Sequence, residues 1–196
     1  MTDRSTLYAK DLTASSQADG SSSERLSPER LSSERLSPER FRAAFRHYPS
    51  GVAVVTADGP DGPIGVTVTS LRSLSASPAL VAFSIARTAS TWPGFVAAER
   101  LLVHLLGVGQ EELATRFATS GIDRFAAPTD WAPQRGGLPR LAGAQVVLQC
   151  HKTHQLTFGE SDLIVAEVLE TEHAPTDGPL LYSDGGYHQL HPRPSK

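Results

Sequence analysis

The side chains best suited to chemistry gather in two short polar stretches. The first, residues 67–75, leaves a predicted strand and enters a loop, and most of its positions are Ser, Thr or Arg. Hydroxyls and backbone N–H groups are the donors that a planar, acceptor-rich heterocycle or a phosphate needs. The same residues could form a hydroxyl-rich turn that satisfies its own backbone. Composition alone favours the turn, and both interpretations stay open here.

The second polar stretch, residues 87–92, leads into a predicted helix. Arg87, Ser90 and Thr91 place a cation and two hydroxyls just before the first helical turn. Helix N-termini attract phosphate through unpaired N–H groups and the helix dipole, and arginine adds a charge-assisted contact. Simple N-capping by Ser90, with Arg87 in solvent, explains the pattern equally well.

Residues 150–154, Cys-His-Lys-Thr-His, have the residue types of a metal site. Residues three apart on a strand point to opposite faces, so His151 and His154 are expected to diverge. We therefore expect no metal. His104 lies inside an apolar strand and is interpreted as a hydrogen-bonded core histidine. Nothing in the chain resembles a motif for Ser–His or Cys–His nucleophilic catalysis.

Three helices are expected around these stretches, over about 38–47, 90–98 and 110–119. In the first, Phe41 and Phe45 lie on one face with other apolar residues. A serine followed by proline precedes that helix, which is a typical helix start.

Most of the remaining chain is predicted to be short strands. They span residues 52–57, 64–70, 79–85, 101–106, 144–153 and 162–172. Loops rich in Pro and Gly occupy 120–139. Many short strands with few helices favour a mainly β fold, a closed or partly closed antiparallel barrel. The glycine fingerprints of Rossmann and P-loop folds are absent from the sequence.

The N-terminal region has a different composition. Residues 1–36 are rich in Ser, Glu and Arg, and residues 22–31 recur as a near copy in 32–41. Such a segment cannot bury enough apolar surface to offset its ordering entropy. We expect an unfolded tail over 1–36, one domain over 37–191 and a short C-terminal tail over 192–196.

Charge and hydropathy narrow the class of protein. The net charge of −3 gives no sign of a nucleic-acid binder. The sequence shows no apolar run long enough to span a bilayer and no signal peptide, so we expect no membrane association. One cysteine, Cys150, excludes an intrachain disulfide and fits a cytoplasmic location.

Taken in order, the motifs of residues 38–190 resemble those of the flavin reductase family, the reductase components of two-component flavin-dependent monooxygenases. The matching motifs are residues 41–45 (FRAAF), 49–56 (PSGVAVVT), 65–67 (GVT) to Ser70, 73–75 (SLS), Pro78, 90–92 (STW), 116–118 (RFA), 123–126 (DRFA), 137–139 (GLP), 179–182 (PLLY) and 186–187 (GY). Each is weak alone, but their order and spacing together are specific.

The resemblance implies an FMN-binding split barrel, a six-stranded antiparallel Greek-key barrel with flanking helices, usually a homodimer. It implies FMN or FAD as cofactor, NADH or NADPH as co-substrate, and an oxygenase partner that receives the reduced flavin. The residues implied for the isoalloxazine ring and ribityl chain are Thr69, Ser70, Leu71 and Arg72, with Ser75 and Ala76 close by. Those implied for the phosphate end are Arg87, Ser90 and Thr91. Those implied to close over the flavin are Arg124, Phe125 and Ala126, with Tyr187 near the nicotinamide.

One departure from the family bears on the chemistry. A turn that usually reads Gly-Asp-His reads Gly159-Glu160-Ser161 here, so Ser161 replaces a histidine associated with the nicotinamide side. Glu160 or His154 could compensate. The departure motivates two alternatives to a reductase: a flavin enzyme acting directly on an organic substrate, and a non-catalytic flavin-binding protein. Asparagine is also common in the family where this chain has His104.

Overall fold

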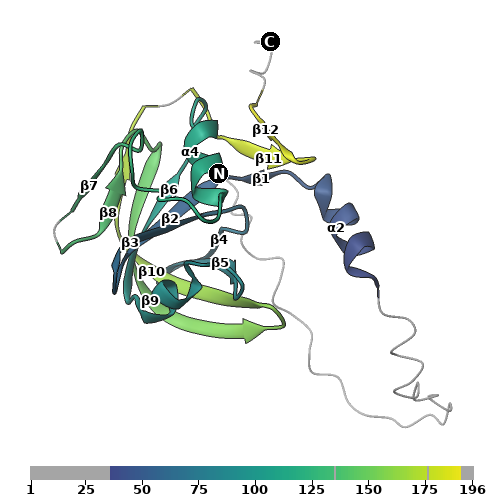
Figure 1. The fold of residues 1–196 in the computed structure, drawn as a ribbon, viewed down its shortest axis with the longest axis horizontal. Helices are drawn as coiled ribbons and strands as arrows, with labels where there is room; N and C mark the ends of the chain where they lie inside the picture. The colour runs from purple at the N-terminus through teal and green to yellow at the C-terminus, as the bar shows by residue number, and fades with distance from the viewer. Residues whose placement is uncertain (1–35, 135, 176, 191–196) are drawn as a thin grey trace, which may run out of the picture. The chain divides into compact units, whose positions relative to one another are not determined.

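A computed structural model describes residues 36–134, 136–175 and 177–190 (Figure 1). Apart from Leu36, the two predicted tails lie outside these residues, and so does most of the duplication.

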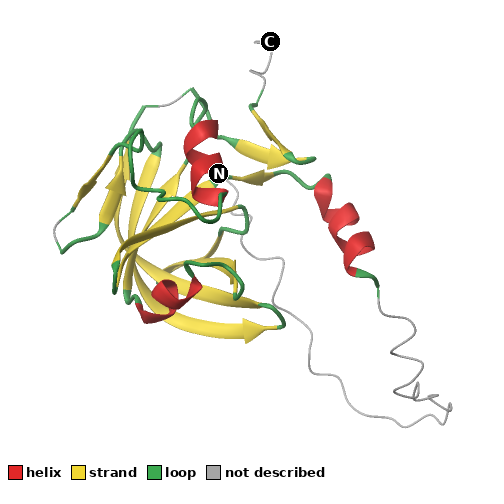
Figure 2. Ribbon diagram, in the orientation of Figure 1, coloured by secondary structure: helices red, strands yellow, loops and turns green. Residues whose placement is uncertain are grey.

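The described chain contains three helices and many short strands (Figure 2). The helices are α2 (Pro38–Arg46), α3 (Trp92–Ala97) and α4 (Glu111–Ala118). The strands are β1 (Ser50–Gly51), β2 (Ala53–Gly59), β3 (Gly62–Val68), β4 (Arg72–Ala76), β5 (Ala79–Ala86), β6 (Arg100–Leu105), β7 (Trp131–Pro133), β8 (Pro139–Leu141), β9 (Val146–Phe158), β10 (Ser161–His173), β11 (Leu181–Ser183) and β12 (Gly186–His188). Each of the three expected helices is confirmed to within two residues at either end.

Seven strands form the main sheet, in the order β3-β2-β6-β9-β10-β5-β4, and every pairing in it is antiparallel. The mainly β fold with flanking helices is therefore confirmed. The sheet has one strand more than the six expected. The extra strand is β4, whose polar sequence was predicted to be a loop but which pairs with β5. The loops predicted over 120–139 likewise contain the two-stranded ladder of β7 and β8.

The main sheet curls around one apolar core. Val68 of β3 and Phe83 of β5 come from strands far apart in the sheet order, yet both belong to the same buried cluster. Cys150 and Ile164 join it from the long β9–β10 hairpin, and Phe95 joins it from α3. The central strands β2 and β6 are buried along most of their length, in runs of consecutive residues, so they do not show the alternation of an antiparallel sheet with one solvated face.

Helix α4 packs on β3 and positions the polar stretch that follows this strand. A Cβ atom at Gly65 would overlap the Phe117 ring, so glycine permits the close approach of helix and strand. The Thr67 hydroxyl donates to the carbonyl of Ala114 at 2.6 Å. Phe117 also belongs to a second buried cluster, which includes Leu180, next to β11.

No helix in the described part of the chain is long and apolar enough to cross a membrane.

Candidate functional site

The connection between β3 and β4 is held by its own side chains. The Ser70 hydroxyl accepts a hydrogen bond from the Ser84 N–H at 2.9 Å, which ties the connection to β5. Arg72 donates to the Leu71 carbonyl at 2.8 Å, and its guanidinium lies 5.9 Å from the centre of the Tyr48 ring. These contacts fix the connection, while Ser70 and Arg72 remain solvent-exposed.

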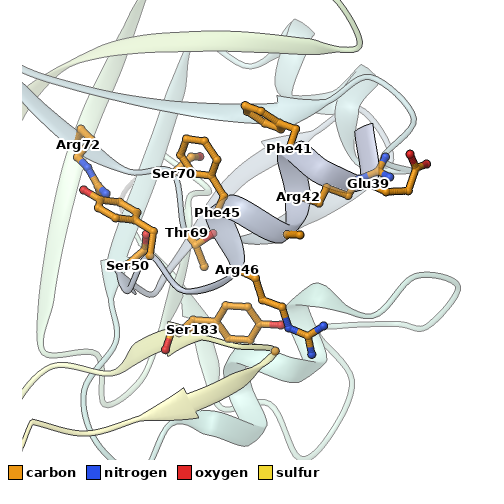
Figure 3. A pocket seen from close by; sticks show the side chains of 14 residues that line it. Glu39, Phe41, Arg42, Phe45, Arg46, Ser50, Thr69, Ser70, Arg72 and Ser183 are labelled. Atoms are coloured by element: carbon orange, nitrogen blue, oxygen red, sulfur yellow. The ribbon is translucent and has the colours of Figure 1, made fainter. Parts of the chain in front are cut away.

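A cavity of about 910 Å³ opens between this connection and α2. Its lining residues are Glu39, Phe41, Arg42, Ala43, Phe45, Arg46, Tyr48, Ser50, Thr69, Ser70, Arg72, Tyr182, Ser183 and Gly185. Figure 3 shows Thr69, Ser70 and Arg72 gathered to one side of α2, whose aromatic side chains form another wall. The volume lies within the usual range of small-molecule sites, about 300–1,000 Å³.

Three predicted ring-binding residues, Thr69, Ser70 and Arg72, line this cavity. Leu71 does not line it; its side chain packs against the main core and borders a smaller cavity of about 250 Å³. Ser75 and Ala76 lie on β4, where the Ser75 hydroxyl accepts the Ser77 N–H at 3.2 Å. They are also outside the lining of the larger cavity.

The predicted phosphate stretch ends at α3. The N-cap position of α3 is Thr91, not Ser90, and no side chain caps this helix. Simple capping by Ser90 is therefore not what the stretch does. The Thr91 hydroxyl is buried, with the residue only 7% exposed, and it has no hydrogen-bond partner among the described residues. Arg87 lies with its guanidinium 5.4 Å from the centre of the Trp92 ring.

The loop that contains Arg124, Phe125 and Ala126 is fixed to α4 by one arginine. Arg116 donates from Nη2 to the carbonyls of Ala126 and Ala127, both at 3.1 Å, and from Nε to that of Arg124 at 3.3 Å. The Phe125 ring stacks edge-on between Phe117 and Trp131, with ring centres 5.2 and 5.1 Å apart.

The Arg124 carbonyl helps to build this loop, since it accepts from Arg116 and from the Thr129 hydroxyl, but the Arg124 side chain differs. Its Nε is buried and has no partner among the residues that the structure describes, and burial lowers the pKa of its guanidinium. Buried polar atoms without a partner are rare, because each costs about 1–3 kcal/mol. Thr91 Oγ1 and Arg124 Nε are thus two unsatisfied donors, both on residues that the sequence assigned to the cofactor.

Tyr187 and Ser161, the residues predicted near the nicotinamide, lie on different sheets. The Tyr187 ring stacks on that of Tyr182, a cavity-lining residue, with ring centres 5.3 Å apart. Ser161 opens β10 and pairs with Ala86 of β5 and Phe158 of β9. Ser161 therefore lies beside the Arg87 stretch, where the Arg87 N–H donates to the Glu160 carbonyl at 2.9 Å.

His154 is poorly placed to replace the missing histidine. It pairs with Val165, four residues along β10 from Ser161, which is roughly 13 Å at about 3.3 Å per residue.

The expectation that His151 and His154 point to opposite faces of the sheet was wrong. A bulge in the β9–β10 ladder pairs His151 with Glu167 and His154 with Val165, so the two imidazoles share one face. Within the described residues, no group of three or more His, Cys, Asp or Glu side chains could hold a metal ion.

His104 is confirmed as a core histidine. It is fully buried, with Nδ1 3.1 Å from the Val54 carbonyl, and its Nε2 accepts the Leu141 N–H at 3.1 Å. These partners define a neutral ring with the proton on Nδ1. Burial lowers the pKa of His104 to about 4; the bond to Val54 opposes this shift and the charge of Arg140 adds to it.

A buried carboxylate that the sequence analysis did not predict lies beside the phosphate stretch. Asp162 is 2% exposed and accepts hydrogen bonds from Trp92 Nε1 at 2.8 Å, Gln155 Nε2 at 2.6 Å and the Thr157 hydroxyl at 2.9 Å. The bond from Trp92 is the largest of the effects that hold the pKa of Asp162 below its usual range, and burial opposes it. Asp162 is in phase with the inward residues Ile164 and Ala166, and this alternation is the signal that could have found it.

Comparison with known proteins adds an independent line of evidence. The family model described as "Flavin reductase like domain" matches residues 45–191. An NADH:FMN oxidoreductase of Rhodococcus qingshengii is 41% identical over 157 residues, which cover 78% of this chain and 81% of the relative. The NADH:FAD oxidoreductase of Streptomyces globisporus, solved in complex with NAD and FAD fragments, has a TM-score of 0.75 at 30% identity; the match covers 83% of this chain and 99% of that one. The styrene monooxygenase flavin reductase of Pseudomonas putida has a TM-score of 0.70 at 28% identity, over 79% of this chain and 99% of that one.

Proposed function

Since the chain belongs to the flavin reductase-like domain family, we propose that it is an NADH-dependent FMN reductase that supplies reduced flavin to a partner oxygenase. The named relatives support each part of this proposal: one is an NADH:FMN oxidoreductase and another is the flavin reductase of a monooxygenase. The Streptomyces protein is named for FAD, at 30% identity to this chain, whereas the Rhodococcus relative is named for FMN, at 41% identity. We propose FMN because the Rhodococcus relative is the more similar of the two.

One observation in this chain carries the proposal. In the described part of the chain, the buried donors without a partner are Thr91 Oγ1 and Arg124 Nε, and they belong to two segments that the family resemblance assigned to the flavin. Other buried polar groups, such as Thr56 and His104, have partners within the protein. Each of these donors calls for an acceptor, and FMN offers acceptors in its phosphate and ring carbonyls.

The residues therefore divide by the part of the cofactor that they would hold. Arg87, Ser90 and Thr91 would bind the phosphate end, and Arg124 would close over the flavin from its loop. Thr69, Ser70 and Arg72 would offer hydroxyl and backbone donors to the ring and ribityl chain. Leu71 would contribute its backbone, because its side chain packs into the core.

When bound, FMN supplies the chemistry, because it accepts two electrons and a proton equivalent from NADH. The protein needs no nucleophile for this reaction. Its residues bind and orient the two nucleotides, and positioning of this kind supplies a large part of the rate. Donors near the ring would stabilise negative charge that develops there. Ser161 and Tyr187 are proposed to contact the nicotinamide side.

We also propose that the active form is a homodimer. No residue of α2 is buried, and Phe41, Phe45 and Tyr48 are each more than half exposed although they stack on one another. An exposed apolar face of this size indicates an interaction surface. Because the same helix forms one wall of the large cavity, a second copy seated on it would help to enclose the ligand. A cytoplasmic location belongs to the same proposal.

The decisive test is anaerobic mixing of the full-length protein with FMN and NADH while the oxidised flavin band is followed. Catalytic bleaching is expected. Flavin that binds but is reduced by neither NADH nor NADPH would refute the reductase and leave flavin binding intact.

The phosphate assignment has its own test. A Ser90→Ala, Thr91→Ala double variant should bind FMN at least about 10-fold more weakly, since charge-assisted hydrogen bonds contribute about 1.5–3 kcal/mol each. Thr88→Ala, an exposed hydroxyl in the same stretch with no assigned role, is the matched control. Equal FMN affinity in the double variant and the control would exclude this phosphate site.

A further inference from the structure

A continuous hydrogen-bond chain ties both ends of α3 to the β9–β10 hairpin. At the C-terminal end, the Lys152 ammonium donates to the carbonyls of Phe95 at 3.0 Å and Val96 at 2.6 Å, which is a typical way for a cation to satisfy the last carbonyls of a helix. Lys152 also donates to Gln155 Oε1 at 3.4 Å, and Gln155 donates to Asp162.

At the N-terminal end, Asp162 holds the Trp92 indole. The Trp92 Nε1–H donates to Asp162 Oδ2 at 2.8 Å, and this oxygen also accepts from Gln155. The other oxygen, Oδ1, accepts from Thr157, so three donors surround one buried carboxylate. A buried charge with this many partners defines the orientation of each of them.

The orientation of Trp92 matters because two phosphate-stretch residues depend on it. Thr91 directly precedes it in the chain, and its buried hydroxyl has no hydrogen bond to any described residue. Arg87 lies over the Trp92 ring at 5.4 Å, a cation–π distance. Moving the indole would therefore displace a cation and a hydroxyl together.

We propose that Asp162 is a positioning residue for the phosphate-binding stretch, acting through Trp92. This inference rests on the proposed function. Asp162 fixes the indole, which lies against Arg87 and next to Thr91 in the chain, and the charge of Asp162 also attracts Arg87 directly. Ring binding is assigned to the β3–β4 connection and does not depend on this chain of contacts.

The prediction concerns the difference between two ligands. FMN carries the phosphate and riboflavin does not, so loss of positioning should weaken FMN alone. We expect Asp162→Asn to raise the Kd of FMN about tenfold, with the Kd of riboflavin unchanged within twofold; the tenfold change equals about 1.4 kcal/mol. The measurement is fluorescence titration of the full-length protein with each flavin.

Two further variants keep the test clear. Trp92→Phe removes the indole donor but leaves a buried carboxylate and an aromatic ring, so it should reproduce the FMN-specific loss if Asp162→Asn fails to fold. Thr157→Val removes a bond to the same carboxylate without touching α3, and it should leave the FMN-to-riboflavin ratio near that of the wild type.

The outcomes separate the inference from the proposed function. A wild type that binds FMN no more tightly than riboflavin would refute the phosphate site, and the inference would fall with it. A wild type that prefers FMN, with a preference unchanged in Trp92→Phe, would overturn the inference alone. Equal weakening of both flavins would assign Asp162 a purely structural role and would also overturn it.

Discussion

His104 makes the stability of this fold dependent on pH in a way that can be calculated. The imidazole is buried and neutral, with a pKa of about 4, whereas a histidine in the unfolded chain has a pKa of about 6.5. As pH falls, the unfolded state therefore binds a proton before the folded state does. The contribution is complete above pH 6.5 and is lost as the pH falls toward 4.

The size of the effect follows from the two pKa values. The difference, 6.5 − 4, corresponds to about 3 kcal/mol when fully expressed, at about 1.36 kcal/mol per unit. Between pH 7.5 and pH 5, the same two values give a loss of about 2 kcal/mol. Such a loss is a large fraction of the stability of an ordinary domain.

Urea unfolding of the protein without flavin, at pH 7.5 and pH 5, measures this loss. Other groups also titrate between these values, so His104→Asn is the reference. At pH 7.5 the variant should be less stable than the wild type by about 1–3 kcal/mol, because the Leu141 N–H loses its acceptor. At pH 5 that gap should shrink by about 2 kcal/mol. An equal gap at both pH values would refute the assignment of a neutral, unprotonated His104.

Three other predictions concern the Arg116 contacts, the exposed Phe45 and the buried Cys150. Arg116→Ala should loosen the loop that carries Arg124, so amide exchange at Ala126 and the Kd of FMN should both rise; unchanged exchange would mean that Arg116 does not organise this loop. Phe45→Glu should convert a dimer to monomer in light scattering, and a dimer that persists would place the interface elsewhere. Burial raises the pKa of the Cys150 thiol to about 12, so this thiol should resist alkylation at pH 8 until urea unfolds the protein; rapid labelling of the folded protein would contradict its burial.

The helices were predictable because their signals are local. The proline at the start of α2 and the apolar spacing of α4 act within a few residues of each other, and neither depends on distant contacts. The strand β4 was missed for the opposite reason. Its sequence, RSLSA, has little intrinsic strand preference, and it is a strand because β5 lies beside it. Strand preference depends strongly on such context.

The candidate site divides in the same way. Thr91 and Arg124 could be proposed as site residues because family motifs span them in sequence, and Arg87 because it lies just before one of these motifs. The alternation at the start of β10 could have marked Asp162 as buried, but the roles of Asp162 and Lys152 could not be predicted, since they exist only where the β9–β10 hairpin meets α3. The bulge near His154 shows a further limit: one extra residue in a ladder reverses the face of the residues beyond it, and no local signal announced that residue.

The way this fold satisfies its buried polar groups is itself an argument for a ligand. The Asp162 carboxylate accepts three hydrogen bonds, and both ring nitrogens of His104 have a partner. A carboxylate and an imidazole are harder to bury than a hydroxyl, yet the protein supplies hydrogen bonds to both. Thr91 Oγ1 has no partner among the described residues, and leaving a buried donor unpaired costs about 1–3 kcal/mol. The unpaired Thr91 hydroxyl is explained if its partner is a ligand, because a donor already bonded within the protein would contribute little to the binding of a phosphate. The same reasoning applies to Arg124 Nε, so both atoms support the flavin site that we propose.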